Sequence, residues 1–236
     1  MREPLPGSPF TIQVSEGLAS ASGSFVGEAA SKQGEQASKQ GGGVAQPMVD
    51  LIKGTSFVAG EHIILRPQVR DEFGNNAGAP EDMLTANHVK PGEVEAEDLG
   101  TPKAKGGLGS YEVVVEPIRA GVHQMHVLLN GQDISGSPVS FHIAPAGASS
   151  SKCKLRTVMP PDNEPLIEKT PIAIRATLFD KYGNQLDHGG VRVDAKASGV
   201  GVSGAKVEDN KDGTYTISLV AGPPGEIKVT VRIDGN

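Results

Sequence analysis

Cysteine and aromatic side chains are scarce in this sequence of 236 residues. It has one cysteine, Cys153, no tryptophan, and only 4% aromatic residues. A single cysteine excludes an internal disulfide, which many secreted β-domains carry between their sheets. The glycosylation motif Asn-x-Ser/Thr is also absent from the sequence. Both absences favour a reducing, cytoplasmic location over an extracellular one.

Long apolar runs and an excess of basic charge are missing too. The apolar runs are far shorter than the roughly 20 residues that a membrane-spanning helix needs. The first ten residues, MREPLPGSPF, lack the apolar segment of a signal peptide. The net charge of −6 is spread along the chain, which leaves no basic face for nucleic acid or anionic lipid. We therefore expect no nucleic-acid partner and no insertion into a membrane.

The residue combinations that carry catalysis or bind cofactors do not occur. Residues 41–43 are glycines but lack the Lys-Ser/Thr and the helix of a phosphate-binding loop. His123 and His126 lie on opposite faces of one predicted strand, which suits no single metal ion. The acidic run at 93–98 is expected to be a solvated face, because a calcium site needs oxygens that converge from a tight loop. Cys153 has no neighbouring histidine and is expected to be structural. The sequence thus predicts no enzyme, cofactor or metal site.

Glycine and proline, in contrast, are abundant, with 31 and 17 residues. They separate short runs in which apolar and polar residues alternate, the pattern of half-buried β-strands. Pro67 inside one run indicates an edge strand or a bulge. The pattern predicts an all-β chain of tandem immunoglobulin-like β-sandwiches with about seven strands each. The predicted strands are 49–52, 61–70, 83–89, 94–99, 111–115, 123–129 and 140–144, and then 171–179, 191–197, 205–208, 215–220 and 227–233.

Parts of the sequence recur at a constant spacing. Gly109-Ser110-Tyr111 returns 104 residues later as Gly213-Thr214-Tyr215, and the Asn-Gly pair at 130–131 returns as Asp-Gly at 234–235. Such spacing indicates a domain repeat of about a hundred residues. In both copies the tyrosine follows a glycine turn, where its ring can be buried while its hydroxyl bonds to the main chain.

The phase of the repeat predicts four segments. Residues 1–14 are the last strand of a preceding repeat, with Phe10, Ile12 and Val14 on one face, and 15–43 are a flexible linker rich in Gly, Ser, Ala and Gln. Residues 44–146 are a complete repeat, and 152–236 are a repeat without its last strand. A sheet short of a strand has an open edge. This phase motivates the hypothesis that residues 7–14 fill that edge, within or between molecules; the alternative is that both ends are loose.

Four motifs together resemble the filamin repeat. The turn D-x-[FY]-G-N is followed in that family by N-x-D-G-[TS]-Y, by P-x-x-x-G-x-[HY], and by the ending G-x-x-I-x-G-S-P-[FV]. The central repeat keeps only Gly109-Ser110-Tyr111 of the second motif. The resemblance covers residues 44–236 and 4–14. The first motif occurs twice, at 71–75 and 180–184. The second occurs in full at 210–215, the third at 117–123 and the fourth at 131–139.

The resemblance implies a non-enzymatic scaffold or interaction fragment. Filamin-type repeats bind partner peptides as an added strand along the edge formed by their third and fourth strands. A spacer in a cytoskeletal, actin-associated or ciliary assembly is also implied. Two alternatives stay open: an adhesion ectodomain, and a repeat segment of a regulatory protein such as a ubiquitin ligase. Equally, the edge strands could serve only to cover the core. The candidate peptide contacts are Met83, Thr85 and Asn87 in the central repeat, and Val191, Val193 and Ala195 in the last.

Overall fold

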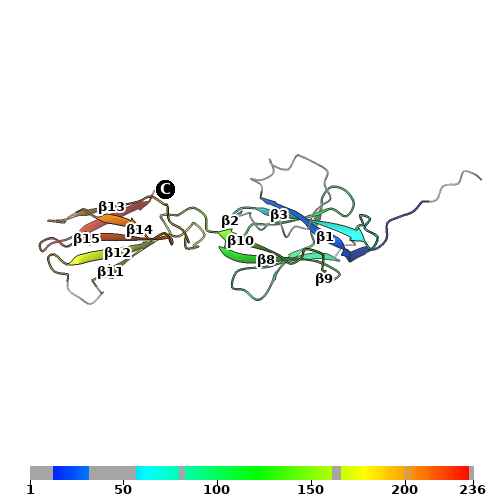
Figure 1. Ribbon diagram of the computed structural model, residues 1–236, viewed down its shortest axis with the longest axis horizontal. Coiled ribbons are helices and arrows are strands. Elements are labelled where there is room, and N and C mark those ends of the chain that lie inside the picture. Colours follow the sequence, from blue (N-terminus) through cyan, green and yellow to red (C-terminus); the bar gives the residue numbers. More distant parts are fainter. Residues whose placement is uncertain are drawn as a thin grey trace, which may run out of the picture. The chain divides into compact units, whose positions relative to one another are not determined.

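The computed structural model describes residues 13–31, 57–79, 83–160, 166–199, 201–202 and 204–233. These residues form strands and turns, and none of them belongs to a helix long and apolar enough to cross a membrane. The chain forms two compact units (Figure 1). Unit 1 holds the first strand together with 63–115 and 123–141, and unit 2 holds 142–233 with the short segments 57–62 and 116–122.

The strands before residue 145 form two sheets. One has the order β1-β3-β7-β6, and the other has the order β2-β10-β8-β4-β5, with β9 paired to β8. The strands are β1 (Ala19–Ser31), β2 (Phe57–Val58), β3 (Ile63–Asp71), β4 (Leu84–Val89), β5 (Glu97–Gly100), β6 (Lys103–Ala104), β7 (Tyr111–Val115), β8 (Gly121–Leu129), β9 (Gln132–Asp133) and β10 (Val139–Ala144).

The remaining strands form two further sheets in unit 2. One is four-stranded with the order β11-β12-β15-β14, and the other pairs β13 with β16. The strands are β11 (Lys154–Met159), β12 (Pro171–Thr177), β13 (Val193–Ser198), β14 (Lys206–Asp209), β15 (Thr214–Val220) and β16 (Lys228–Ile233).

The two units repeat one plan. The order β11-β12-β15-β14 matches β1-β3-β7-β6, and the pair β13-β16 matches β4-β8. The register agrees as well, since Val193 is paired with Ile233 where Leu84 is paired with Leu129. The sequence predicted both the all-β immunoglobulin-like sandwich and its internal repeat, and the structure confirms them.

Strand β1 is the largest difference from the sequence prediction. Residues 15–43 are predicted to be a flexible linker, yet 19–31 pair antiparallel with β3. The sequence pattern does not reveal this strand, because most of its side chains are small, and polar and apolar residues do not alternate along it. The small side chains allow its main chain to approach β3 closely: a Cβ at Gly23 would overlap the main-chain oxygen of Asp71. Val26 alone adds a large apolar side chain to the core from the part of β1 whose burial is described. The linker prediction is wrong for 19–31, and residues 32–43 lie outside the described chain.

Three further predictions about strands can be compared with the structure. The predicted first strand at 49–52 lies outside the described residues, as does most of the predicted strand at 7–14. Pro67 was expected to mark an edge strand or a bulge. Strand β3 is not an edge, because it lies between β1 and β7, but the β1–β3 register shifts next to Pro67, with the additional residue on β1. The weak strand predicted at 94–99 is shorter and later, at Glu97–Gly100.

A buried aspartate organises the same turn in each unit. Asp71 accepts main-chain hydrogen bonds from Phe73 and Asn75 and a side-chain bond from Asn75. A fourth bond comes from the N–H of Gly17, at 2.9 Å. The turn therefore also holds the chain where it enters β1. The hydrogen bonds, that of the Asn75 side chain foremost, lower the pKa of the Asp71 carboxyl to about 2.

Asp180 repeats this arrangement in unit 2. It accepts hydrogen bonds from the main chain of Tyr182 and Asn184 and from the Asn184 side chain. Its fourth donor is the N–H of Ala146, at 2.9 Å. Burial raises the pKa of this carboxyl, but the four hydrogen bonds outweigh it, so the pKa lies below its ordinary value of 3.8. Gly74 and Gly183 have positive φ values, 87° and 92°, at these turns, a conformation that glycine adopts without steric cost.

The two repeated tyrosines have the predicted structural role. The ring of Tyr215 is buried, and its hydroxyl accepts a hydrogen bond from the N–H of Val191 at 2.9 Å. In the same way, the Tyr111 hydroxyl accepts a bond from the N–H of Ala79 at 2.9 Å. Each tyrosine thus fastens the loop that leads into the next strand of the other sheet.

Candidate functional site

The predicted peptide contacts in the central repeat lie on a strand that already has two neighbours. Thr85 and Asn87 alternate with buried residues of β4 and face outward. Asn87 is paired with His126 on one side and with Asp98 on the other. Strand β5 therefore occupies the edge of β4 to which a peptide was predicted to add. A peptide cannot add to β4 where β5 pairs with it, at Ala86, Asn87 and His88. Peptide contact by Met83, Thr85 and Asn87 stays a prediction. Met83 precedes β4 and is partly exposed.

The matching strand in unit 2, β13, has a free edge. Among the residues that the structure describes, it pairs only with β16. Val193 belongs to the core, and Val191 and Ala195 pack against the same core cluster. Side chains of the predicted contacts thus point inward, while the main chain of β13 presents an unpaired edge. Which side chains would meet a peptide stays a prediction.

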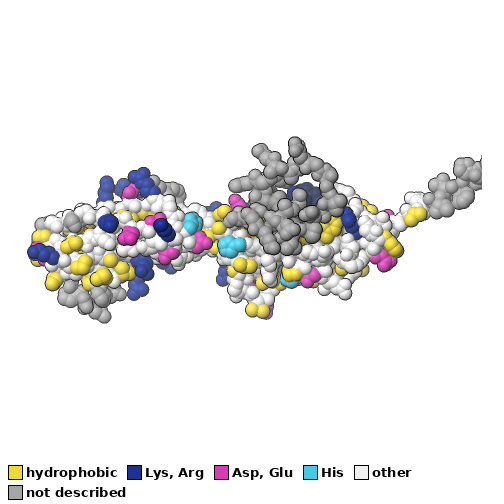
Figure 2. Space-filling view, viewed as in Figure 1, with side chains coloured by type: hydrophobic (Ala, Val, Ile, Leu, Met, Phe, Trp, Pro, Cys, Tyr) yellow, Lys and Arg dark blue, Asp and Glu magenta, His cyan; other side chains and the backbone are white. Residues whose placement is uncertain are grey.

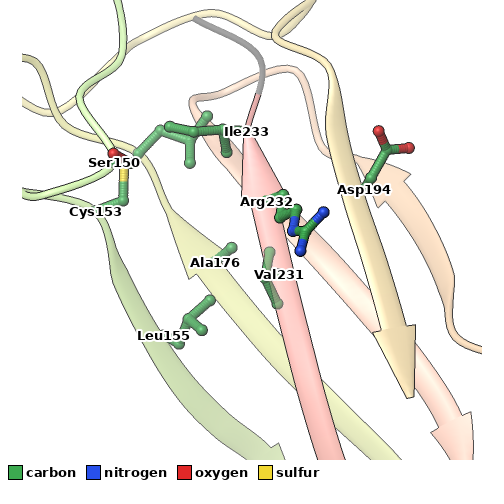
Figure 3. A pocket seen from close by; sticks show the side chains of 9 residues that line it. Ser150, Cys153, Leu155, Ala176, Asp194, Val231, Arg232 and Ile233 are labelled. Atoms are coloured by element: carbon green, nitrogen blue, oxygen red, sulfur yellow. The ribbon is translucent and has the colours of Figure 1, made fainter. Parts of the chain in front are cut away.

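Strand β16 likewise has a side on which none of the described strands pairs with it. A cavity of about 600 Å³ lies beside it, between β16 and the strands β11 and β12 (Figure 3). We call it the β16 cavity. Its lining is part apolar and part polar. The lining residues are Ser150, Cys153, Leu155, Ala176, Leu178, Asp194, Val231, Arg232 and Ile233.

The positions of β16 that line this cavity belong to the core in unit 1. On β8, Met125, Val127 and Leu129 are fully buried. The residues 104 positions later on β16, which include Val231 and Ile233, are only partly buried. All six residues of β11 are exposed, and Leu155 among them is 55% exposed. Figure 2 shows apolar side chains gathered over β11 and β12 on the face that it draws.

Two buried histidines in unit 1 were not predicted from the sequence. His88 Nε2 lies 2.8 Å from His123 Nδ1, so one imidazole donates a hydrogen bond to the other. The two rings are stacked, and the ring of Phe141 stacks on His123. Burial, and then the neighbouring His123, lower the pKa of His88 below its ordinary value of 6.5. Only the register between β4 and β8 could have revealed this pair.

This histidine pair predicts that unit 1 loses stability in mild acid. The unfolded chain protonates His88 near pH 6.5, whereas the folded chain does so only at lower pH. Glu97 opposes this effect and Lys90 adds to it, since both face His88. The contribution is complete above pH 6.5 and is lost as the pH falls through the folded pKa. We expect the urea midpoint of unit 1, followed by hydrogen exchange of β4 and β8, to be lower at pH 5.5 than at pH 7.5.

Variants separate this effect from general acid sensitivity. His88→Leu should flatten the dependence of the midpoint between these two pH values. The exposed His142 offers a matched control, and His142→Gln should leave the dependence as it is. Equal slopes in all three proteins would contradict a role for the pair.

The other candidate groups have structural surroundings. Within the described residues, no cluster of three or more His, Cys, Asp or Glu side chains could hold a metal ion. The acidic run at 93–98 is exposed, as predicted. The Cys153 thiol donates a hydrogen bond to the main-chain oxygen of Ser149. Of the polar groups predicted from the sequence, none is brought into a catalytic arrangement in the described chain.

Comparison with known proteins places the chain among immunoglobulin-like repeats. The family model described as Invasin, domain 3 matches residues 168–236. Filamin-C of mouse (Mus musculus) is 28% identical over 142 residues, and rat (Rattus norvegicus) filamin-C gives the same values. These matches cover 53% of this chain and 4% of filamin-C. The chain therefore spans a small fraction of the length of these relatives.

The solved structure of FdeC, an adhesin of Escherichia coli, has a similar fold. Its TM-score is 0.53 at 16% identity, and the match covers 94% of this chain and 62% of the FdeC chain. At this identity the similarity defines the fold alone. The chain is thus a protein of immunoglobulin-like repeats, with similarity to filamin in one comparison and to invasin in another.

Proposed function

We propose that this chain is a non-enzymatic protein-interaction fragment whose unit 2 binds an extended partner peptide by strand addition to β13. The observation that carries the proposal is the edge of β13 that no described strand occupies. Such an edge offers a row of main-chain N–H and C=O groups to a further strand. The peptide's main chain then supplies affinity, and alternate side chains supply specificity.

The chemistry along β13 suits a peptide with alternating character. Inward-facing Val191 and Ala195 are partly buried beside the core and offer apolar contact at this edge. Outward-facing Arg192 and Asp194 form an exposed ion pair of 3.2 Å. We infer that a partner peptide places apolar residues on the first face and polar residues on the second. The resemblance to filamin repeats supports this mode and a spacer role in a cytoskeletal or ciliary assembly.

A test begins with peptides selected on the intact chain from a displayed random library. The strongest binder is then synthesised with N-methyl groups at alternate residues, which removes the N–H donors on one side of the peptide strand. One alternate set should weaken the Kd at least about tenfold, since a lost main-chain hydrogen bond costs roughly 1 to 1.5 kcal/mol. The other set faces solvent and should bind normally, which makes it the matched control.

Hydrogen exchange then locates the peptide. Amides of β13 that do not bond to β16 should become protected when the peptide binds. If both N-methylated sets bind equally well, or if protection appears only in unit 1, strand addition to β13 is excluded.

A second candidate is an adhesion ectodomain, and the match of the invasin family model to residues 168–236 favours it. In that case the repeats would project a binding surface outside the cell. Labelling of intact source cells with a membrane-impermeant biotin reagent distinguishes the two. Labelled native protein supports the adhesin, and protein labelled only after lysis supports the predicted cytoplasmic location.

A further inference from the structure

Basic side chains gather on one face of unit 2, although the chain as a whole is acidic. Acidic residues outnumber basic ones in 1–151, whereas the two are nearly equal in number in 152–236. On the sheet β11-β12-β15-β14, Arg156 and Lys154 of β11 lie opposite Arg175 and Thr177 of β12. The three basic residues are exposed, and we call them the basic cluster. Because two strands contribute to it, the distribution of charge along the sequence does not predict it.

The two arginines of the basic cluster face each other across the strands. Arg156 is paired directly with Arg175, and like charges in such a position destabilise a sheet. Among the described residues, no carboxylate forms an ion pair with either guanidinium. Arg175 acts on the carboxyl of Asp212, but hydrogen bonds from Thr214 are the main cause of the lowered pKa of that group. The described part of unit 2 therefore keeps a repulsive pair of charges without neutralising it.

Unit 1 neutralises the corresponding arginine. Arg66 stands five residues before the turn aspartate of unit 1, as Arg175 does in unit 2. The Nε of Arg66 lies 3.9 Å from a carboxylate oxygen of Glu112, and the same oxygen accepts a 2.7 Å bond from Lys105. The repeat of 104 residues places Thr216 at the position of Glu112, and Thr216 is paired with Arg175. Unit 2 thus has a hydroxyl where unit 1 has the neutralising carboxylate.

An apolar area adjoins the basic cluster on the same face of the sheet. Along β12, the outward residues after Arg175 toward the start of the strand are Ala173 and Pro171. Ala173 is paired with Met159 of β11, and Pro171 is paired with Val220 of β15. Met159 is 50% exposed and Val220 is 43% exposed. The face therefore presents cations toward one end of β12 and apolar side chains toward the other.

We propose that the outer face of the sheet β11-β12-β15-β14 binds a segment of a partner protein in which acidic residues are followed by apolar ones. The carboxylates of the segment contact the basic cluster, where a guanidinium can bind a carboxylate through two parallel hydrogen bonds. Its apolar residues cover Met159 and Val220. This site is a face of one sheet, so it is separate from the edge of β13 and from the β16 cavity. It can therefore be present or absent whether or not a peptide adds to β13.

Three features favour a protein segment over a uniformly charged polyanion. Lys154 and Arg156 are alternate residues of β11, about 7 Å apart, which is also the spacing of alternate side chains in an extended peptide. Glu208 is paired with Thr216 on the side of β15 away from Arg175, so a polyanion crossing the sheet from the arginines would meet a carboxylate. The apolar area gains stability only when apolar side chains cover it, and a sulfated or phosphorylated chain has none to offer.

The first experiment uses a fluorescein-labelled synthetic peptide and the full chain. The peptide has glutamates at three alternate positions, then leucines at two alternate positions, with serines between them. Fluorescence anisotropy should show saturable binding that weakens as the salt concentration rises. A peptide with glutamine in place of each glutamate should bind at least about tenfold more weakly, because the charge-assisted bonds are lost. Absence of saturable binding at low salt, or equal binding of the two peptides, would overturn the proposal.

Thr216→Glu locates the site, because it gives unit 2 the carboxylate that Glu112 supplies in unit 1. We expect this variant to bind the glutamate peptide at least about tenfold more weakly than wild type. Thr216→Gln has nearly the same size without the charge and should bind as wild type does. Circular dichroism checks that both variants fold. Equal affinities of the two variants would contradict a role for Arg175.

A second pair of variants does not alter Thr216. Arg156→Ser combined with Arg175→Ser should abolish binding, and both side chains are exposed, so the fold should tolerate the change. Lys196→Ser combined with Lys228→Ser removes the same charge from exposed positions of the other sheet of unit 2 and should leave binding intact. Equal losses in the two double variants would show that the peptide responds to net charge alone. A heparin oligosaccharide that binds this face, while leucine-free and leucine-containing peptides bind equally, would replace the protein segment with a polyanion.

Discussion

Gly213→Ala is expected to destabilise unit 2 by roughly 3 kcal/mol, as the sum of a conformational and a steric cost. Gly213 has a φ of 77°, where an L-residue with a side chain is disfavoured. In addition, a Cβ at this position would overlap the main-chain carbonyl of Leu186. The turn cannot move aside easily, because the N–H of Leu178 donates a hydrogen bond to the Gly213 carbonyl at 2.9 Å.

Urea denaturation followed by circular dichroism measures the loss, and hydrogen exchange of β12 and β15 assigns it to unit 2. Gly183→Ala provides the matched control, since its φ of 92° is similar but nothing lies within 4 Å of a Cβ there. The control should lose only the conformational part, about 1 kcal/mol. Equal losses in the two variants would show that the close approach to Leu186 contributes nothing.

Asp180→Ala should be at least as damaging, with a loss of roughly 3 to 5 kcal/mol. The substitution leaves four N–H groups without their shared acceptor in a turn where the carboxylate is fully buried. Asp180→Asn keeps the shape and one acceptor oxygen. It should therefore cost less than the alanine variant, as measured by the same urea experiment. If both variants unfold at the wild-type midpoint, the hydrogen bonds of Asp180 are not a source of stability.

The pH dependence of the urea midpoint tests whether the negative charge of Asp180 contributes to stability. The folded pKa of Asp180 lies below its unfolded value of 3.8, so the unfolded chain takes up the proton first. Its contribution is present above pH 3.8 and is lost as the pH falls through the folded pKa. The wild-type midpoint should drop between pH 5 and pH 3, and the Asp180→Asn variant should drop less. Asp71, with a pKa of about 2, should give unit 1 the same dependence.

The sequence was most informative where local pattern and tertiary role agree. Alternating apolar residues located β8, β10 and β15, and the recurrent Gly-Thr-Tyr located the turn at Gly213. Strand β1 could not be found in this way, because main-chain bonds and close approach hold it while its side chains are small. The prediction of a linker there followed from composition alone.

Contacts between strands distant in sequence were the other source of error. The pairing of β5 with β4 joins two strands across a turn, and periodicity does not state which edges remain free. The histidine pair likewise depends on the register of β4 and β8, which pairs His88 with Met125 and so brings His123, two residues from Met125 on the same face, next to His88. For the candidate site, the resemblance to filamin repeats pointed to β13, whose other edge no described strand occupies. It could not show that Val193 belongs to the core.

The aspartate turns bear on how these repeats respond to mechanical load. Tension applied ahead of β1 reaches the hydrogen bond between Gly17 and Asp71 before it reaches the β1–β3 ladder. In unit 2, tension arriving ahead of β11 meets the bond between Ala146 and Asp180 first. A pulled chain would therefore release a short length at each buried aspartate before any strand is peeled away. Because the pKa values of Asp71 and Asp180 are low, both carboxylates are charged at neutral pH. These two hydrogen bonds would therefore persist at neutral pH and weaken only in strong acid.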